Sequence, residues 1–191
     1  MAKELNFKNM TLTLFVITLV ASASLGLVYQ STKDPIAEAQ MAKINSAIEA
    51  VVPEFNNQPT KESYSVQIDG GELIFYPVKK DEQLVGTAVK TFSNNGFAGR
   101  IELMVGFLPD NSINKIAVVM HKETPGLGDK MDPAKSNFSV QFEGKDPETF
   151  KLSVKKDGGD VDAITASTIS SRAYCDAVQR AFKALKEGGA K

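Results

Sequence analysis

The sequence contains no tryptophan, one histidine and one cysteine, and these gaps exclude several classes of protein. The single cysteine, Cys175, has no partner for a disulfide within the chain, and an iron–sulfur cluster needs several thiolate ligands. No dinucleotide-binding Gly-x-Gly-x-x-Gly string, no Walker-type phosphate loop and no spacing of metal ligands is present. The chain therefore lacks the parts of a self-sufficient oxidoreductase, and Cys175 is expected to be a packing residue.

Net charge is also small, because 22 basic and 23 acidic residues leave a formal charge of −1. This balance gives no basic surface of the kind that binds nucleic acid. Charge is missing altogether between Lys8 and Lys33, where the residues from Thr11 to Tyr29 are mostly apolar. A helix needs about 20 such residues to cross the hydrocarbon core of a bilayer. Residues 10–30 are therefore predicted to form a transmembrane anchor.

A cleaved secretory signal is the alternative interpretation of this segment. Ala21-Ser22-Ala23 offers the small residues of a cleavage site, and the mature chain would then start near Ser24. The apolar run continues to Tyr29, however, which is long for the core of a signal and favours an uncleaved anchor.

The charges that flank the span predict its orientation. Lys3 and Lys8, opposed by Glu4, precede it, whereas Lys33 and Asp34 follow it as a neutral pair. The positive-inside tendency then places residues 1–9 in the cytoplasm and the rest of the chain on the periplasmic or extracytoplasmic side of the inner membrane.

Beyond the span, residues 31–62 are predicted to be a connecting helix and loop, with a helix over Pro35–Val52 that ends at Pro53. Residues 63–191 contain alternating apolar runs separated by Gly, Pro and Asn. The predicted strands are Tyr64–Ile68, Glu72–Val78, Leu84–Phe92, Arg100–Leu108, Ser112–Met120 and a last strand at Phe150–Lys156. Asp132–Gln141 is expected to be a short helix or a loop. The pattern predicts an α+β domain: a compact, mostly antiparallel sheet flanked by helices.

A helix is predicted after Ser170, where apolar residues recur at i, i+4 and i+8 from Ala173 to Leu185. Small and hydroxylated residues occupy the segment Asp162–Arg172 directly before it. The first N–H groups of a helix are unpaired and carry a partial positive charge, so they bind phosphate well. Ser, Thr and Asp are also ordinary helix caps, and capping is the alternative interpretation.

The segment Asp162–Arg172 resembles the flavinylation motif of the FMN-binding domains in Rnf and Na⁺-translocating NADH:quinone reductase complexes. In that family a separate flavin transferase joins FMN, through its phosphate, to the last threonine of a Ser-Gly-Ala-Thr tetrad. The tetrad here is Thr165-Ala166-Ser167-Thr168, which differs at three positions by small-residue exchanges. The resemblance implies a phosphoester of FMN on Thr168, with Thr165 as the second choice.

A second string has the same order and a fitting distance along the chain. Glu123-Thr124-Pro125-Gly126-Leu127-Gly128 resembles the loop that covers the flavin in this family. Taken alone it is a Pro/Gly turn after a strand, in which the two glycines let backbone approach a ligand closely. The resemblance implies that Glu123, Thr124, Gly126, Leu127 and Gly128 help to bind the cofactor.

The resemblance further implies that Lys155, or its neighbour Lys156, approaches the isoalloxazine or the phosphate. A positive charge at that position would stabilise an anionic reduced flavin and raise its reduction potential. The alternative is a solvated lysine pair before the turn that starts at Asp157.

The family resemblance implies an electron-transfer protein like the G subunits of Rnf complexes, which move electrons between ferredoxin and NAD⁺ in an ion-translocating assembly. Its partners would be other membrane subunits and the flavin transferase. Within the same class, the alternatives are the C subunit of the quinone reductase and a free-standing extracytoplasmic flavoprotein. From other classes, they are a colourless membrane-tethered binding module and a secreted ligand-binding protein.

Overall fold

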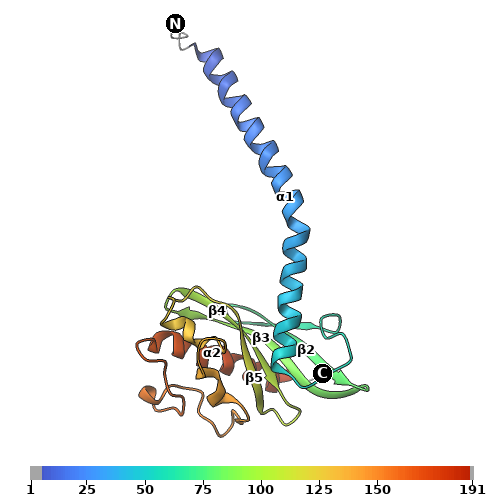
Figure 1. Cartoon of the computed structure of the whole chain (residues 1–191), viewed down its shortest axis with the longest axis vertical. Helices are drawn as coiled ribbons and strands as arrows, with labels where there is room; N and C mark the ends of the chain where they lie inside the picture. Colours follow the sequence, from blue (N-terminus) through green and yellow to red (C-terminus); the bar gives the residue numbers. More distant parts are fainter. Residues whose placement is uncertain (1–5, 190–191) are drawn as a thin grey trace. The chain divides into compact units, whose positions relative to one another are not determined.

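The computed structural model describes residues 6–189, so Lys3 and Glu4, which entered the prediction of orientation, lie outside the described residues. The chain divides into two units, Met1–Ala42 and Lys43–Lys191. A long helix, α1 (Phe7–Val51), comes first, five strands follow, and the helix α2 (Thr168–Ala184) comes near the end (Figure 1). The predicted class, α+β with an antiparallel sheet and helices, is confirmed.

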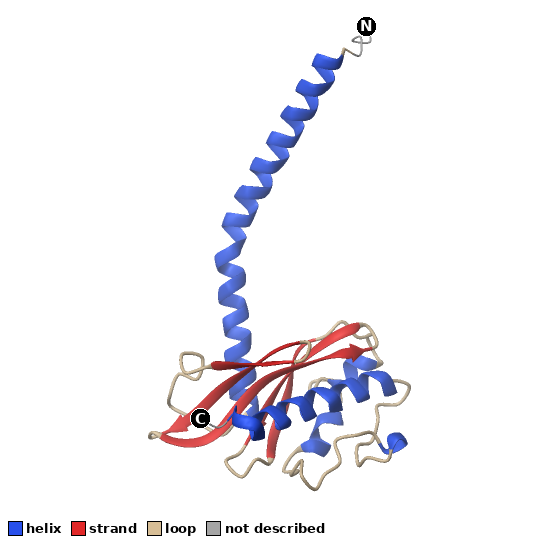
Figure 2. Ribbon diagram, turned by 180° about the vertical axis from the view of Figure 1, so that it is seen from behind, coloured by secondary structure: helices blue, strands red, loops and turns tan. Residues whose placement is uncertain are grey.

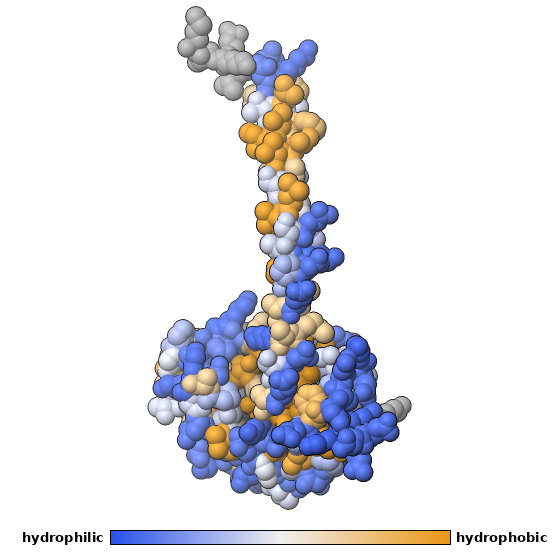
Figure 3. Space-filling model, turned by 45° about the vertical axis from the view of Figure 1, so that its right-hand side comes forward, coloured by the Kyte–Doolittle hydropathy of each residue, from blue (hydrophilic) through white to orange (hydrophobic). Residues whose placement is uncertain are grey.

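Helix α1 is continuous through Pro35, although the sequence predicted a separate helix starting there. A proline inside a helix removes one backbone hydrogen bond but does not always end the helix. In its first part α1 is long and apolar enough to cross a membrane, with a mean hydropathy of 2.1 over 18 residues (Figure 3). The hydroxyls of Thr18 and Ser22 donate to carbonyls four residues earlier, at 3.0 and 2.7 Å, which satisfies them without water.

The sheet is a simple antiparallel meander in the order β1-β2-β3-β4-β5. Each strand follows its neighbour through a short connection, as the Gly and Asn turn signals predicted. All five of the first predicted strands are present: β1 (Tyr64–Ile68), β2 (Gly71–Lys80), β3 (Gln83–Gly96), β4 (Gly99–Phe107) and β5 (Ile113–Met120).

The last predicted strand, Phe150–Lys156, is wrong. This segment makes one isolated bridge between Val154 and Val161, and the chain then turns through a 3₁₀ helix, Lys155–Asp157. The segment Asp132–Gln141 is mostly loop that leads into a second 3₁₀ helix, Phe138–Phe142. A third 3₁₀ helix, Gly128–Met131, follows the Pro/Gly loop.

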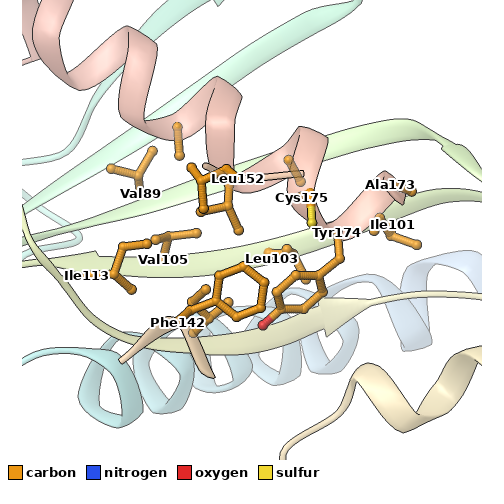
Figure 4. Packing of buried hydrophobic residues seen from close by; sticks show 14 of the residues in the cluster. Val89, Ile101, Leu103, Val105, Ile113, Phe142, Leu152, Ala173, Tyr174 and Cys175 are labelled. Carbon is orange, nitrogen blue, oxygen red and sulfur yellow. The ribbon is translucent and has the colours of Figure 1, made fainter. Parts of the chain in front are cut away.

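The two faces of the sheet bury different partners. Helix α2 lies across one face, where its small apolar residues pack on alternate strand residues (Figures 2 and 4). The side chains of this core include Val89, Leu103, Val105, Phe142, Tyr174 and Cys175. The other face packs against Ile48 and Val51 at the end of α1.

Cys175 is confirmed as a buried packing residue, with 3% of its surface exposed. Burial disfavours the charged thiolate and raises the pKa of Cys175 to about 12.

Candidate functional site

The two strings that resemble flavin-binding motifs meet at one cavity of about 340 Å³. Three elements form its wall: the turn between β3 and β4, the loop after β5, and the first turn of α2. The lining residues are Phe97, Glu123, Thr124, Leu127, Gly128, Ala166, Ser167, Thr168, Ile169 and Ser170. The fold thus brings together segments that lie tens of residues apart in the sequence.

The start of α2 offers unpaired backbone donors to this cavity. Ser167 precedes the helix, yet its side chain makes no capping hydrogen bond. The first helical hydrogen bond runs from Ser171 N–H to Ser167 O, at 3.0 Å. The N–H groups of the first three residues, from Thr168 onward, therefore have no acceptor within the helix. Ser167 therefore does not act as an ordinary helix cap. The free N–H groups at the start of α2 are suited to binding an anion.

The tetrad itself has one unusual backbone conformation. Ala166 has a φ of 62°, in the left-handed region that costs a residue with a Cβ about 1–2 kcal/mol. Ser167 N–H donates to Ile164 O at 3.0 Å, which closes the turn that contains Thr165 and Ala166. This turn exposes Thr165 and leaves Thr168 half-buried at the cavity wall.

Glu123 connects all three elements of the wall. Its side chain is buried, with 5% exposed. Oε1 accepts a hydrogen bond from Ala98 N–H at 3.1 Å, in the β3–β4 turn, and Oε2 accepts one from the Ser170 hydroxyl at 2.7 Å. Ser170 also lies 2.9 Å from the Ser167 hydroxyl. Because a carboxylate only accepts, Ser170 donates to Glu123, and Ser167 is left to donate to Ser170.

The glycines of the Pro/Gly loop have two different roles. Gly126 has a φ of 79°, and a Cβ there would meet nothing within 4 Å. Gly128 is packed, because a Cβ there would lie 2.6 Å from Glu123 Oε2 and 2.7 Å from Ser170 Oγ. The space beside Gly128 is thus filled by the protein's own hydrogen-bonded pair, and Gly128 also lines the cavity.

Lys155 does not line the cavity. Its ammonium pairs with Asp162 at 2.8 Å, and 60% of its side chain is exposed. Two other predicted residues, Thr165 and Gly126, do not line the cavity either. Each is the neighbour in sequence of a lining residue, Ala166 and Leu127 respectively. Three lining residues were not predicted to contact a cofactor: Phe97, Ile169 and Ser170. The signal for Phe97 and Ile169 was weak, because exposed apolar residues in a loop or in a first helical turn are individually common. Ser170 is a buried serine, and its contact with Glu123 appears only in the folded chain.

Near its start, α2 is tied to the 3₁₀ helix Lys155–Asp157. The guanidinium of Arg172 donates to both carboxylate oxygens of Asp157, at 2.7 and 2.8 Å. These bonds hold the pKa of the Asp157 carboxyl below its ordinary value and raise the pKa of Arg172. The arrangement fixes the start of α2 against its neighbour.

A larger cavity, of about 1090 Å³, lies along the C-terminal half of α2. Its lining includes Gln67, Phe150, Arg180 and Lys186, and none of the residues predicted to bind the cofactor. Volume alone therefore does not identify the site, whereas the clustered motif residues do.

Comparison with known proteins shows the family of the chain. The family of FMN-binding domains matches residues 96–183, a range that contains every lining residue of the 340 Å³ cavity. The chain is 34% identical to the G subunit of the ion-translocating oxidoreductase complex of Escherichia coli K12 over 192 residues, covering 95% of this chain and 91% of that protein. The protein of the same name from Shewanella amazonensis is 31% identical over 172 residues, covering 85% and 80%. For the Aliivibrio fischeri ES114 protein the identity is 31%, covering 91% and 88%.

Proposed function

The chain belongs to the family formed by the G subunits of ion-translocating oxidoreductase complexes, and on this basis we propose that it transfers electrons through an FMN held in the 340 Å³ cavity and esterified to Thr168. The observation that carries this proposal is the convergence of the Thr168 turn and the Glu123 loop on one cavity.

The start of α2 fits the phosphate of FMN. Its uncapped N–H groups, described above, supply hydrogen-bond donors and a partial positive charge at the point where Thr168 presents its hydroxyl. A phosphate esterified to Thr168 would thus be stabilised by the first turn of the helix that carries it.

The apolar part of the cavity wall fits a flat ring system. Phe97, Leu127 and Ile169 line it with 69%, 41% and 47% of their surfaces exposed. Exposed apolar side chains around one cavity are typical of a binding site for a largely apolar ligand. The flavin supplies the redox chemistry, and these residues hold its ring, exclude water from one side and fix its orientation.

Thr168 is favoured over Thr165 as the attachment residue. Thr168 lines the cavity and begins α2, so its ester oxygen would lie beside the free N–H groups. Thr165 is exposed in the preceding turn and does not line the cavity. A covalent bond at Thr168 would also retain the cofactor outside the cell, where released FMN would be diluted.

The rest of the assignment follows from the family and the span. The first part of α1 would anchor the chain by a single pass, with the flavin domain on the periplasmic or extracytoplasmic side and other membrane subunits of an Rnf-type complex as redox partners. Ion translocation would belong to the assembled complex, because no charged residue lies between Lys8 and Lys33. A flavin transferase would complete maturation.

The experiment is expression of the full chain with a flavin transferase, beside Thr168→Ala and Thr165→Ala. We expect wild-type protein to gain the mass of FMN less one water and to fluoresce after denaturing electrophoresis. Thr168→Ala should lose both signals, and Thr165→Ala should keep them. Unmodified wild-type protein beside an active transferase would overturn the proposal and favour a colourless binding module. Flavin retained by Thr168→Ala and lost by Thr165→Ala would move the attachment to Thr165.

A further inference from the structure

We propose that Glu123 lowers the reduction potential of the flavin by placing a fixed negative charge in its cavity. This inference rests on the function proposed above. Of the ten lining residues, Glu123 is the one with a charged side chain. This lowering of the reduction potential is opposite to the raised potential that the resemblance implied for Lys155.

Both carboxylate oxygens of Glu123 are held by hydrogen-bond donors of the protein. Its two oxygens accept from Ala98 N–H and from the Ser170 hydroxyl, and a charged carboxylate is an acceptor at both. No ion pair within residues 6–189 includes Glu123, so no cation neutralises it directly. Its charge is therefore moderated by these two hydrogen bonds and by the partial positive charge at the start of α2.

Burial makes this charge effective. Only 5% of Glu123 is exposed, and interactions between charges strengthen as water is excluded. An added electron gives the flavin a negative charge unless a proton follows, and a nearby carboxylate raises the energy of that charged form. The carboxylate thus favours oxidised over anionic reduced flavin, which is a lower reduction potential.

Lys155 is poorly placed to oppose this effect. It is paired with Asp162, its side chain is 60% exposed, and it does not line the cavity. Exposed ion pairs are screened by water and salt, so their effect on a group at some distance is small.

The test compares midpoint potentials of the full-length, flavinylated protein, measured by spectroelectrochemical titration. Glu123→Gln removes the charge while keeping the shape of the side chain, and we expect a positive shift. Ser170→Ala keeps the charge but removes one of its two hydrogen bonds, so we expect a negative shift. Glu49→Gln, which removes the same charge from an exposed position on α1, should leave the potential unchanged.

The expected shift in midpoint potential can be related to the preference of the site for reduced flavin. A tenfold change in the preference of the site for reduced over oxidised flavin corresponds to about 59 mV for one electron. We expect Glu123→Gln to change this preference by about tenfold or more, and Lys155→Ala to change it by much less.

Two results would overturn the inference while leaving the flavoprotein assignment intact: flavin bound in Glu123→Gln at the wild-type potential, or a larger shift in Lys155→Ala. If Glu123→Gln fails to fold or to retain flavin, Ser170→Ala decides, because an unchanged or raised potential in that variant contradicts a tuning charge at Glu123. Absence of covalent flavin from wild-type protein would instead contradict the proposed function.

Discussion

The Arg172 guanidinium and the Asp157 carboxylate form a two-pronged ion pair, with both distances between 2.7 and 2.8 Å. The pair joins the beginning of the second turn of α2 to a 3₁₀ helix fifteen residues earlier in the chain.

This pair predicts a specific dependence of stability on pH. The pKa of Asp157 is lower in the folded protein than its ordinary value of about 3.9, which we take for the unfolded chain. Its contribution is therefore fully present above pH ~4 and is lost as the pH falls through the folded pKa. Asp157→Asn should unfold at a lower temperature than wild type at neutral pH, and the difference should shrink below pH ~4.

Thermal unfolding of both proteins across this pH range checks the prediction. Arg172→Gln should resemble Asp157→Asn, and the double variant should be little worse than either single one, because both changes remove the same interaction. If the difference in unfolding temperature between wild type and Asp157→Asn stays constant down to strongly acid pH, the prediction is contradicted.

Ala166 should respond to glycine by gaining stability. Its φ of 62° is strained for a residue with a Cβ and natural for glycine, the residue that the family tetrad has at this position. The strain relief of about 1–2 kcal/mol exceeds the roughly 0.5–1 kcal/mol that glycine's unfolded-state entropy costs. We therefore expect Ala166→Gly to raise the free energy of unfolding by up to about 1 kcal/mol.

Ala163 provides the matched control, because it is also exposed in the same segment but is absent from the residues with positive φ. Ala163→Gly should lower the free energy of unfolding by roughly 0.5 kcal/mol. Chemical denaturation measures both variants, and equal losses at the two positions would show that the turn at Ala166 is not strained.

Gly128 should tolerate alanine worse than Gly126 does. A Cβ at Gly128 would displace the Glu123–Ser170 hydrogen bond, and such overpacking typically costs about 1–3 kcal/mol. At Gly126 the space is open and the cost is the strain of a positive φ, about 1–2 kcal/mol. The contrast should be clearest in the yield of covalent flavin, which we expect Gly128→Ala to reduce and Gly126→Ala largely to keep.

Denaturation curves and flavin fluorescence on denaturing gels measure the two effects separately. Equal flavin yields in the two variants, together with equal losses of stability, would mean that the Glu123–Ser170 contact does not shape the site.

The sequence predicted the sheet well because its signals are local. Alternating apolar residues and Gly or Asn turns specify a meander in which each strand pairs with the next, so the five strands from Tyr64 to Met120 followed directly. The segment Phe150–Lys156 shows the same alternation, yet it has no neighbouring strand over its length and makes one bridge at Val154. Alternation shows which residues are buried, and it does not show whether a partner strand exists.

The candidate site could be predicted in its segments but not in its internal contacts. Thr168 and Glu123 stood out through family strings, whereas the bond from Ser170 to Glu123 joins residues 47 positions apart. Lys155 was assigned through the family resemblance, and the structure shows its side chain paired with Asp162. Such partners depend on side-chain direction after the chain has folded, which no local pattern encodes.

Tyr174 should be replaceable by phenylalanine with a gain in stability. Its ring is fully buried in the core, in contact with Phe138 and with Phe142, which lies beside it in Figure 4. Its hydroxyl has no hydrogen-bond partner among residues 6–189. A buried hydroxyl without a partner costs about 1–3 kcal/mol of desolvation that a phenyl ring does not incur. We expect Tyr174→Phe to raise the free energy of unfolding by about 1 kcal/mol in chemical denaturation. Phe142→Tyr, which adds a hydroxyl to the same core, should lower it, and a loss of stability in Tyr174→Phe would show that an ordered water satisfies the native hydroxyl.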